Sequence, residues 1–561
     1  MRKPLILVRR LSTAAALTLL VACATSPGEG TPATPAPVDA ETLLAQGDAA
    51  LARGELPEAA RAYRLAADAS DDEAVAAQAT RVAFDNFQFG EASGAADRWL
   101  ALNPSSEQAE RYAGVSALAL HRLDEAEEHF ARLIESAYIS TAAGFLALLP
   151  VMMGEGNPAD VTELFRRLAA RHPKLAEGQV ALGTAALRSD NYALAMQSAQ
   201  RAVELAPYWV PAKLLLARTQ IASGQDDLGL AAARDLVTAP DSDVATHIEY
   251  ALLLAGTGQD DEARAVLTPY ASGQVVVPAA VRALGLMDLQ SGDLKAAGAR
   301  FDDLLSTGSQ SYESLYYLGV IAERRDDAER AMGFYSRVVS GDHAISAQQR
   351  VARIKADKSG VDAGLAHLQE FGHAQPTLGP QVVIARAGLL TSFDETRRAI
   401  EVLDEGLAQY PEVFDLRMAR VFAYERDGNG QAAVRDLRKL LEERPGDPVV
   451  QNALGYTLAD QNRQLPEAQA LIEAALVQMP DSAAVLDSMG WVLHRQKRNE
   501  QALGYLKRAY ELGDDAEIAV HLGDVQWAMG DKAAAHETWQ EAVKRHPGNK
   551  LLEKRLARQA Q

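Results

Sequence analysis

From residue 41 onward, small and large apolar residues recur along the chain with helical spacing. A Leu, Met or Ala followed by Gly is succeeded about twelve residues later by Ala, then by an aromatic residue or Leu, and then by Ala or Leu. Apolar residues three to four positions apart lie on one face of a helix. The pattern therefore predicts a long run of short amphipathic helices.

The distance between copies of the pattern is nearly constant. Gly285 and Gly319 are 34 residues apart, Gly455 and Gly490 are 35 apart, and Gly490 and Gly523 are 33 apart. This period and residue pattern resemble the tetratricopeptide repeat. The resemblance implies an all-α, right-handed superhelical solenoid of about fifteen helical hairpins.

The residue types agree with hairpins that must stack. The Gly or Ala on the first helix lets the second helix approach closely, and a single hairpin cannot cover its own apolar face. Pro57, Pro158 and Pro466 are predicted to begin second helices, where a missing N–H is tolerated. The pairs Asp226-Asp227 and Asp260-Asp261 fall at the same junction, where capping is favoured over metal ligation.

The repeats divide into segments at one interruption of the pattern. The stretch 373–380 (HAQPTLGP) predicts a bend between an N-terminal array, 41–372, and a C-terminal array, 381–548. A terminal helix is expected at 549–561. The copies near residues 74–107, 142–174 and 345–375 are degraded.

The composition narrows the possible partners. Ala and Leu dominate and aromatic residues make up 6% of the chain, which favours helices. The net charge of -20 would repel phosphate backbones and anionic lipid surfaces, so nucleic-acid binding is not expected. A single cysteine excludes a disulfide framework.

That cysteine follows a segment that has the features of a targeting signal. Residues 1–22 combine a basic start with a short apolar stretch, as in a secretory signal. The run Leu20-Val21-Ala22-Cys23 resembles a bacterial lipobox, which implies cleavage before Cys23, its acylation, and an outer-membrane anchor with the body in the periplasm. Residues 23–40 then form a Pro- and Ala-rich linker. The alternative is an ordinary signal peptide with an incidental cysteine.

Motifs for catalysis are absent from the sequence. There is no phosphate-binding Gly loop, no HExxH pair and no GxSxG elbow. His121 and His129, near Glu127 and Glu128, could converge on a metal, but they straddle a predicted turn. We therefore expect no catalytic residue, no metal site and no cofactor.

A partner-binding groove is the alternative to an active site. In tetratricopeptide arrays the first helix of each repeat lines the groove, with positions two, five, nine and twelve pointing inward. On the last three repeats this register selects polar and aromatic residues suited to holding an extended peptide. They are Asn452, Tyr456, Asp487, Trp491, His494, Asp524 and Trp527. Packing of Trp491 and Trp527 between repeats is the alternative.

Residues 452–549, from NALGYTLAD to VKRHPGN, are similar to the end of a proteobacterial lipoprotein family. That family includes the lipoprotein partner of the periplasmic carboxyl-terminal processing protease. The resemblance implies a non-catalytic adaptor that recruits and activates this serine protease and brings it peptidoglycan hydrolases. A structural lipoprotein of an envelope export or outer-membrane assembly machine is the second hypothesis, and a glycan-processing enzyme is the third.

Overall fold

The computed structural model describes residues 38–137, 139–272 and 275–557. The signal sequence, Cys23 and most of the linker lie outside these residues. The described part of the chain is overwhelmingly helical and contains no β-strand. The predicted all-α class is confirmed.

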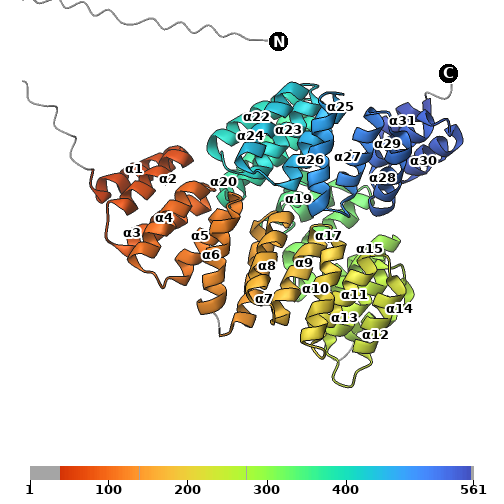
Figure 1. The fold of residues 1–561 in the computed structure, drawn as a ribbon, viewed down its shortest axis with the longest axis horizontal. Coiled ribbons are helices and arrows are strands. Elements are labelled where there is room, and N and C mark those ends of the chain that lie inside the picture. Colours follow the sequence, from red (N-terminus) through yellow and green to blue (C-terminus); the bar gives the residue numbers. More distant parts are fainter. Residues whose placement is uncertain (1–37, 138, 273–274, 558–561) are drawn as a thin grey trace, which may run out of the picture.

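The helices pair into fifteen consecutive hairpins that wind into a superhelix (Figure 1). The first helices are α1 (Ala40–Arg53), α3 (Glu73–Asp85), α5 (Glu107–Ala119), α7 (Thr141–Glu155), α9 (Ala176–Arg188), α11 (Val210–Ala222), α13 (Val244–Gly256), α15 (Pro278–Ser291), α17 (Ser311–Arg324), α19 (Ala344–Ser359), α21 (Gly379–Ser392), α23 (Phe414–Arg426), α25 (Pro448–Asp460), α27 (Ala483–Arg495) and α29 (Ala516–Ala528). The second helices are α2 (Leu56–Asp68), α4 (Phe89–Leu102), α6 (Leu123–Arg132), α8 (Pro158–Arg171), α10 (Tyr192–Leu205), α12 (Asp226–Val237), α14 (Asp260–Ser272), α16 (Leu294–Ser306), α18 (Ala328–Tyr335), α20 (Val361–Ala374), α22 (Thr396–Gln409), α24 (Gly430–Glu443), α26 (Leu465–Gln478), α28 (Asn499–Leu512) and α30 (Lys532–Arg545). A last helix, α31 (Lys550–Ala557), follows, a π-helical turn (η1, Leu133–Ala137) extends α6, and a 3-10 turn (η2, Pro376–Leu378) precedes α21.

The helix starts agree with the sequence in part. Pro57, Pro158 and Pro466 each lie in the first two positions of a second helix, as predicted. The pair Asp226-Asp227 and the pair Asp260-Asp261 lie inside the first turns of α12 and α14. At those positions the carboxylates favour the helix through its dipole and do not act as N-caps, which corrects the capping expectation.

In several hairpins a glycine of the first helix faces a large side chain of the second helix. In α17, a Cβ built on Gly319 would lie 2.5 Å from Cε1 of Tyr335 on α18. In α15, Gly285 meets the ring of Phe301 on α16 in the same way. Phe301 and Tyr335 are fully buried. The glycines therefore mark places where the two helices approach most closely.

We expect Gly319→Ala to destabilise the array by about 1–3 kcal/mol, because the added methyl group overpacks the site beside Tyr335. Gly298→Ala in α16 is the matched control, since nothing lies within 4 Å of its Cβ and alanine favours a helix. Urea unfolding followed by circular dichroism measures both. A Gly319→Ala midpoint equal to that of wild type would contradict the close-approach explanation.

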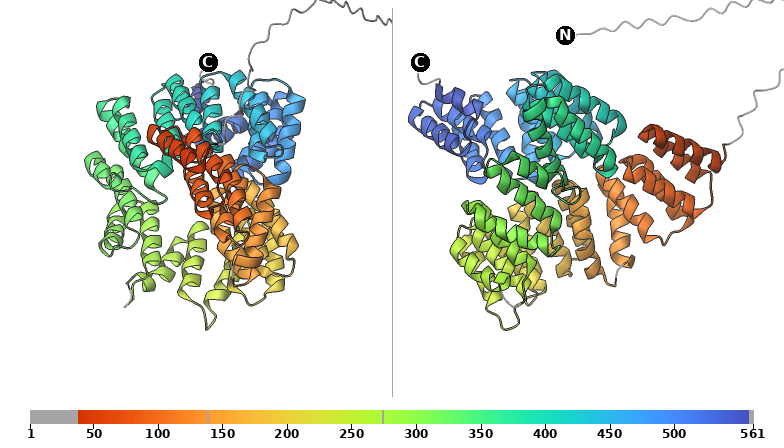
Figure 2. Two further views of the ribbon diagram at one scale, coloured as in Figure 1. Left: turned by 90° about the vertical axis from the view of Figure 1, so that its left-hand side faces the viewer. Right: turned by 180° about the vertical axis from the view of Figure 1, so that it is seen from behind.

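The superhelix brings residues far apart in sequence into contact. The turns α3–α4, α5–α6, α7–α8 and α9–α10 meet the loops α22–α23, α24–α25 and α26–α27, and we call this contact the seam (Figures 1 and 2). Along it, Gln88 Nε2 donates to the Gln409 carbonyl at 2.7 Å. Farther along, the Asp481 amide donates to the Asp190 carbonyl at 3.0 Å.

The stretch 373–380 contains the end of α20, the turn η2 and the start of α21. Helices α20 and α21 contact each other across it. The division of the repeats into two arrays at this point stays a prediction. Among the described residues, no helix has the length and apolar character needed to cross a membrane.

Candidate functional site

The predicted partner-binding residues lie on first helices that contact one another in succession, α25 with α27 and α27 with α29. Tyr456, Trp491 and Asp524 occupy one equivalent position of these helices. Asn452 and Asp487 share another. Because equivalent positions of stacked repeats lie side by side, these residues belong to one continuous face.

The centre of this face is a buried ion pair between two repeats. Nδ1 of His521 on α29 lies 3.0 and 2.9 Å from the two carboxylate oxygens of Asp487 on α27. Burial by itself would lower the pKa of His521, but the charge and hydrogen bond of Asp487, aided by Glu517 and Asp524, raise it. The pair therefore joins α27 to α29 and favours the imidazolium form of His521.

Trp491 packs between repeats, contrary to the expectation that it faces the groove. Its side chain is 7% exposed, and its ring stacks on His521 with centroids 4.1 Å apart. A second stack joins it to His494 at 5.3 Å. The reason is the buried imidazole of the next repeat, which offers a flat partner to the indole.

Tyr456 is half-buried among carboxylates. Its hydroxyl donates to Oε1 of Glu517 at 2.5 Å. Burial is the main cause of a raised pKa of Tyr456, and the charges of Glu517, Asp460 and Asp487 raise it further. Tyr456 thus marks a strongly negative part of the face.

The remaining predicted residues differ in their surroundings. Asp524 forms a bidentate pair with Arg555 of α31 at 2.7–2.9 Å. Half-buried Trp527 stacks on Trp539 at 6.0 Å. The pKa of His494 is lowered, chiefly by burial. Asn452 Oδ1 is buried and has no hydrogen-bond partner among the described residues. Partner binding by the seven residues stays a prediction.

The sequence register missed His521 because this residue does not occupy one of the inward positions. Glu517 occupies position two of the last repeat but was not among the residues selected. One signal could have identified His521. It lies 34 residues after Asp487, which is one repeat length, so the two residues must sit on neighbouring first helices.

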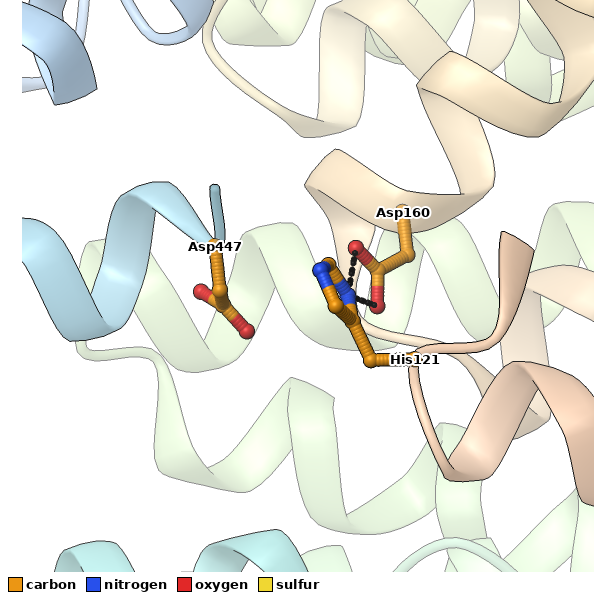
Figure 3. A group of neighbouring side chains, drawn as sticks. All are labelled: His121, Asp160 and Asp447. Carbon is orange, nitrogen blue, oxygen red and sulfur yellow. Dashed lines mark hydrogen bonds and ion pairs between the residues drawn. The ribbon is translucent and has the colours of Figure 1, made fainter. Parts of the chain in front are cut away.

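A second cluster lies on the seam, where side chains from three repeats converge. His121 comes from the turn between α5 and α6, Asp160 from the first turn of α8, and Asp447 from the N-cap of α25. The His121 ring lies between the two carboxylates (Figure 3). Its Nδ1 is 2.8 Å from Oδ1 of Asp160. One ligand atom of each residue lies within 4.8 Å of the others, so the group could hold a divalent cation.

Arg444 already supplies a positive charge to this cluster. Its Nη1 lies 3.9 Å from Asp160 and 3.7 Å from Asp447. Its Nη2 donates to the carbonyl of Ala119 at 2.5 Å, and its guanidinium lies over the ring of Phe414. Burial, and then the charge of Asp160, raise the pKa of Asp447. The cluster is best described as an ion-pair network that joins the N-terminal and C-terminal repeats.

Three turns on the seam have a left-handed backbone at a residue other than glycine. Phe87 has φ 59°, His121 has φ 60° and Asp190 has φ 53°. A bulky residue in this region is strained and persists where its side chain makes compensating contacts. The Phe87 ring packs edge-on against Tyr410 with centroids 5.7 Å apart, and His121 bonds Asp160. The Phe87 ring therefore contacts the opposite side of the seam, whereas His121 holds Asp160 within the N-terminal repeats.

The two histidines considered as a metal pair in the sequence do not meet. His129 on α6 bonds Glu110 at 2.7 Å, whereas His121 faces Asp160. The sequence could not have paired His121 with Asp447, since they come from opposite sides of the seam.

Comparison with known proteins identifies the repeat. The tetratricopeptide-repeat family model matches residues 10–74, 153–208, 282–348, 393–448 and 452–517, which together make up more than half of the chain. The TPR repeat-containing protein PA4667 of Pseudomonas aeruginosa is 34% identical over 209 residues, covering 37% of this chain and 35% of that protein. The aspartyl/asparaginyl beta-hydroxylase of Mus musculus is 24% identical over 210 residues, covering 34% and 28%. The chain thus spans about a third of the length of these relatives.

Two solved structures illustrate the similarity of this chain to other helical arrays. A tetratricopeptide repeat protein from Parabacteroides merdae is 16% identical, with 44% of this chain and 98% of that chain covered, and a TM-score of 0.35. Yeast Tom70 is 12% identical, with 92% and 93% covered, and a TM-score of 0.33. From the extent of the family match, the chain belongs to the tetratricopeptide-repeat family.

Proposed function

We propose that this chain is a non-catalytic adaptor, anchored to the outer membrane through Cys23 with its repeats in the periplasm. In this role it binds a carboxyl-terminal processing serine protease and brings peptidoglycan hydrolases to it. The tetratricopeptide repeats indicate a protein–protein interaction scaffold. The finer proposal is supported by the lipobox-like Leu20-Val21-Ala22-Cys23 and by the family resemblance of residues 452–549.

The observation that carries the proposal is a repeat array that follows the lipobox-like run ending at Cys23 and a Pro- and Ala-rich segment. A tethered scaffold raises the effective concentration of two bound proteins without any chemistry of its own. The repeats offer one continuous face of first helices for such binding, containing Tyr456 and its neighbouring carboxylates. The catalytic serine would belong to the protease.

The test is an affinity purification of the full chain, tagged at its C-terminus, from its native bacterium, with mass spectrometry of the bound proteins. We expect a carboxyl-terminal processing protease together with cell-wall hydrolases. Adding the chain to the purified protease and hydrolase should accelerate cleavage of the hydrolase by the protease. The Cys23→Ala variant should leave the membrane fraction and keep both partners, because anchoring and binding use separate parts of the chain.

Two results would contradict the proposal. Recovery of an export or assembly complex without a protease would favour a structural lipoprotein. A Cys23→Ala chain that stays in the membrane fraction would contradict anchoring through that cysteine.

A further inference from the structure

Three carboxylates lie near Tyr456 without a lysine or arginine to pair with. Glu425 comes from α23, Asp460 from the end of α25, and Glu517 from the first turn of α29. Among the described residues, none of the three forms an ion pair with a lysine or arginine. The contacts they make are with Thr457 and Tyr456 hydroxyls and, at 4.0 Å, with His521. The face therefore carries negative charge that, among the described residues, only His521 balances in part.

The effect of this charge is visible at Glu425. Burial raises the pKa of Glu425, and the charges of Asp460 and Glu517 raise it further against the hydrogen bond from Thr457. Like charges in a partly dry site repel each other more strongly than in water. A cation placed among the three carboxylates would relieve this repulsion.

Aromatic rings lie at equivalent positions of the same helices. Phe422 on α23, Tyr456 on α25 and Trp491 on α27 follow one another in this row. Phe422 is 57% exposed, so its ring is accessible to a partner. An aromatic face attracts a cation and packs against the methylene stem of a basic side chain. The ring of Tyr456 is adjacent to the carboxylates because its hydroxyl bonds Glu517.

An independent sign of a missing ligand is an unpartnered polar atom. Nε1 of Trp491 is buried without an acceptor, in a side chain 7% exposed. The Trp491 ring stacks on His521, whose Nε2 lies 4.0 Å from Glu517. Oδ1 of Asn452, one turn before Tyr456 on α25, also lacks a donor. Buried polar groups without partners are uncommon. The Trp491 N–H needs an acceptor and the Asn452 oxygen needs a donor, which the backbone carbonyl and amide of a bound extended segment can supply.

We propose that this face binds an extended segment of a partner protein through a lysine or arginine side chain. The cation lies among Glu425, Asp460 and Glu517, and its stem packs on Tyr456 and Phe422. The inference rests on the proposed function as a scaffold, and it adds the chemistry of the segment that the scaffold recognises. A basic side chain fits better than a metal ion because the aromatic row would serve no purpose for an ion.

The test uses an array of random twelve-residue peptides, probed with the full chain in detergent. We expect the bound peptides to be enriched in lysine or arginine. In solution, the best peptide should bind roughly tenfold more weakly when its basic residue is replaced by citrulline or norleucine, because a charge-assisted contact is lost. Calcium at millimolar concentration should leave the binding largely unchanged.

The matching variant is Glu425→Gln/Asp460→Asn/Glu517→Gln. It should bind the best peptide roughly tenfold more weakly and melt at the same or a higher temperature, since like-charge repulsion is removed. A purely structural role of the three residues predicts a lower melting temperature instead. The control Glu58→Gln/Glu107→Gln/Asp302→Asn changes the net charge equally at exposed positions of α2, α5 and α16 and should bind like wild type.

Three outcomes would overturn the inference: bound peptides without basic enrichment, wild-type affinity in the triple variant, or equal weakening in the control. The array contains random peptides, so its outcome is independent of the protease. A basic enrichment without protease in the affinity purification would refute the adaptor role alone. Recovery of the protease without basic enrichment would refute this inference alone.

Discussion

Arg444→Ala is expected to open the seam between the N-terminal and C-terminal repeats. The Arg444 side chain is almost fully buried and lies between Asp160 and Asp447. Its loss would leave two buried carboxylates without their guanidinium and the carbonyl of Ala119 without its donor. Removing one partner of a buried ion pair costs about 3–5 kcal/mol, and we expect this loss to weaken closure of the seam.

The hairpins themselves should stay folded in this variant. Among the described residues, each hydrophobic core cluster joins neighbouring repeats, and none crosses the seam. In a solenoid, stability comes from the repeats and their nearest-neighbour interfaces. The loss of Arg444 should therefore destabilise the seam and leave the hydrophobic cores beside it unchanged.

Hydrogen exchange followed by mass spectrometry distinguishes opening of the seam from unfolding of the hairpins. Three seam amides donate across it: Gly90 to Glu412, Tyr192 to Asp481, and Asp481 to the carbonyl of Asp190. We expect these amides to lose protection in Arg444→Ala while those inside α8 and α26 keep it. Arg426→Ala, which removes an exposed arginine within the C-terminal repeats, is the control. Unchanged protection of the seam amides would show that Arg444 is not required for closure.

The second large effect concerns pH at the Asp487–His521 pair. Because the pKa of His521 is raised in the folded chain, the imidazolium is favoured by folding. Its contribution to stability is complete below the unfolded pKa of about 6.5 and is lost as the pH rises through the folded value. The contact between α27 and α29 should therefore weaken from about pH 6.5 upward.

Asp487→Asn should remove this pH dependence and destabilise the last repeats by about 3–5 kcal/mol where His521 is charged. Thermal unfolding between about pH 6 and pH 9, followed by far-ultraviolet circular dichroism, measures both effects. The exposed His373→Gln should keep the wild-type profile. If Asp487→Asn showed the same loss of stability with rising pH, the titrating group would lie elsewhere.

Much of the fold could be predicted because a hairpin is specified locally. The pairing of Gly319 with Tyr335 follows from their spacing, and the structure shows the contact. Even the degraded copies form hairpins, since α3 with α4, α7 with α8, and α19 with α20 occupy them. Each hairpin needs only its neighbours to bury its apolar face. The residue pattern within about two repeat lengths is therefore sufficient to predict the hairpin.

The sequence predicted which helices carry the candidate site residues, but not the contacts that their side chains make. The repeat register placed Asn452, Tyr456 and Trp491 on first helices, where they lie. It could not show that Trp491 is covered by His521, or that Arg555 reaches Asp524. Those contacts depend on how far each repeat turns relative to the next, which the spacing of apolar residues does not encode.

By itself, the sequence determined the helices, their pairing and their order in the array. Only the tertiary structure decided that His121 and Asp160 meet Arg444 and Asp447 across the seam. Small rotations between successive repeats add up over many hairpins, and their sum sets which distant turns come together. Local periodicity is almost unchanged by such rotations, and so the seam could be seen only in the folded chain.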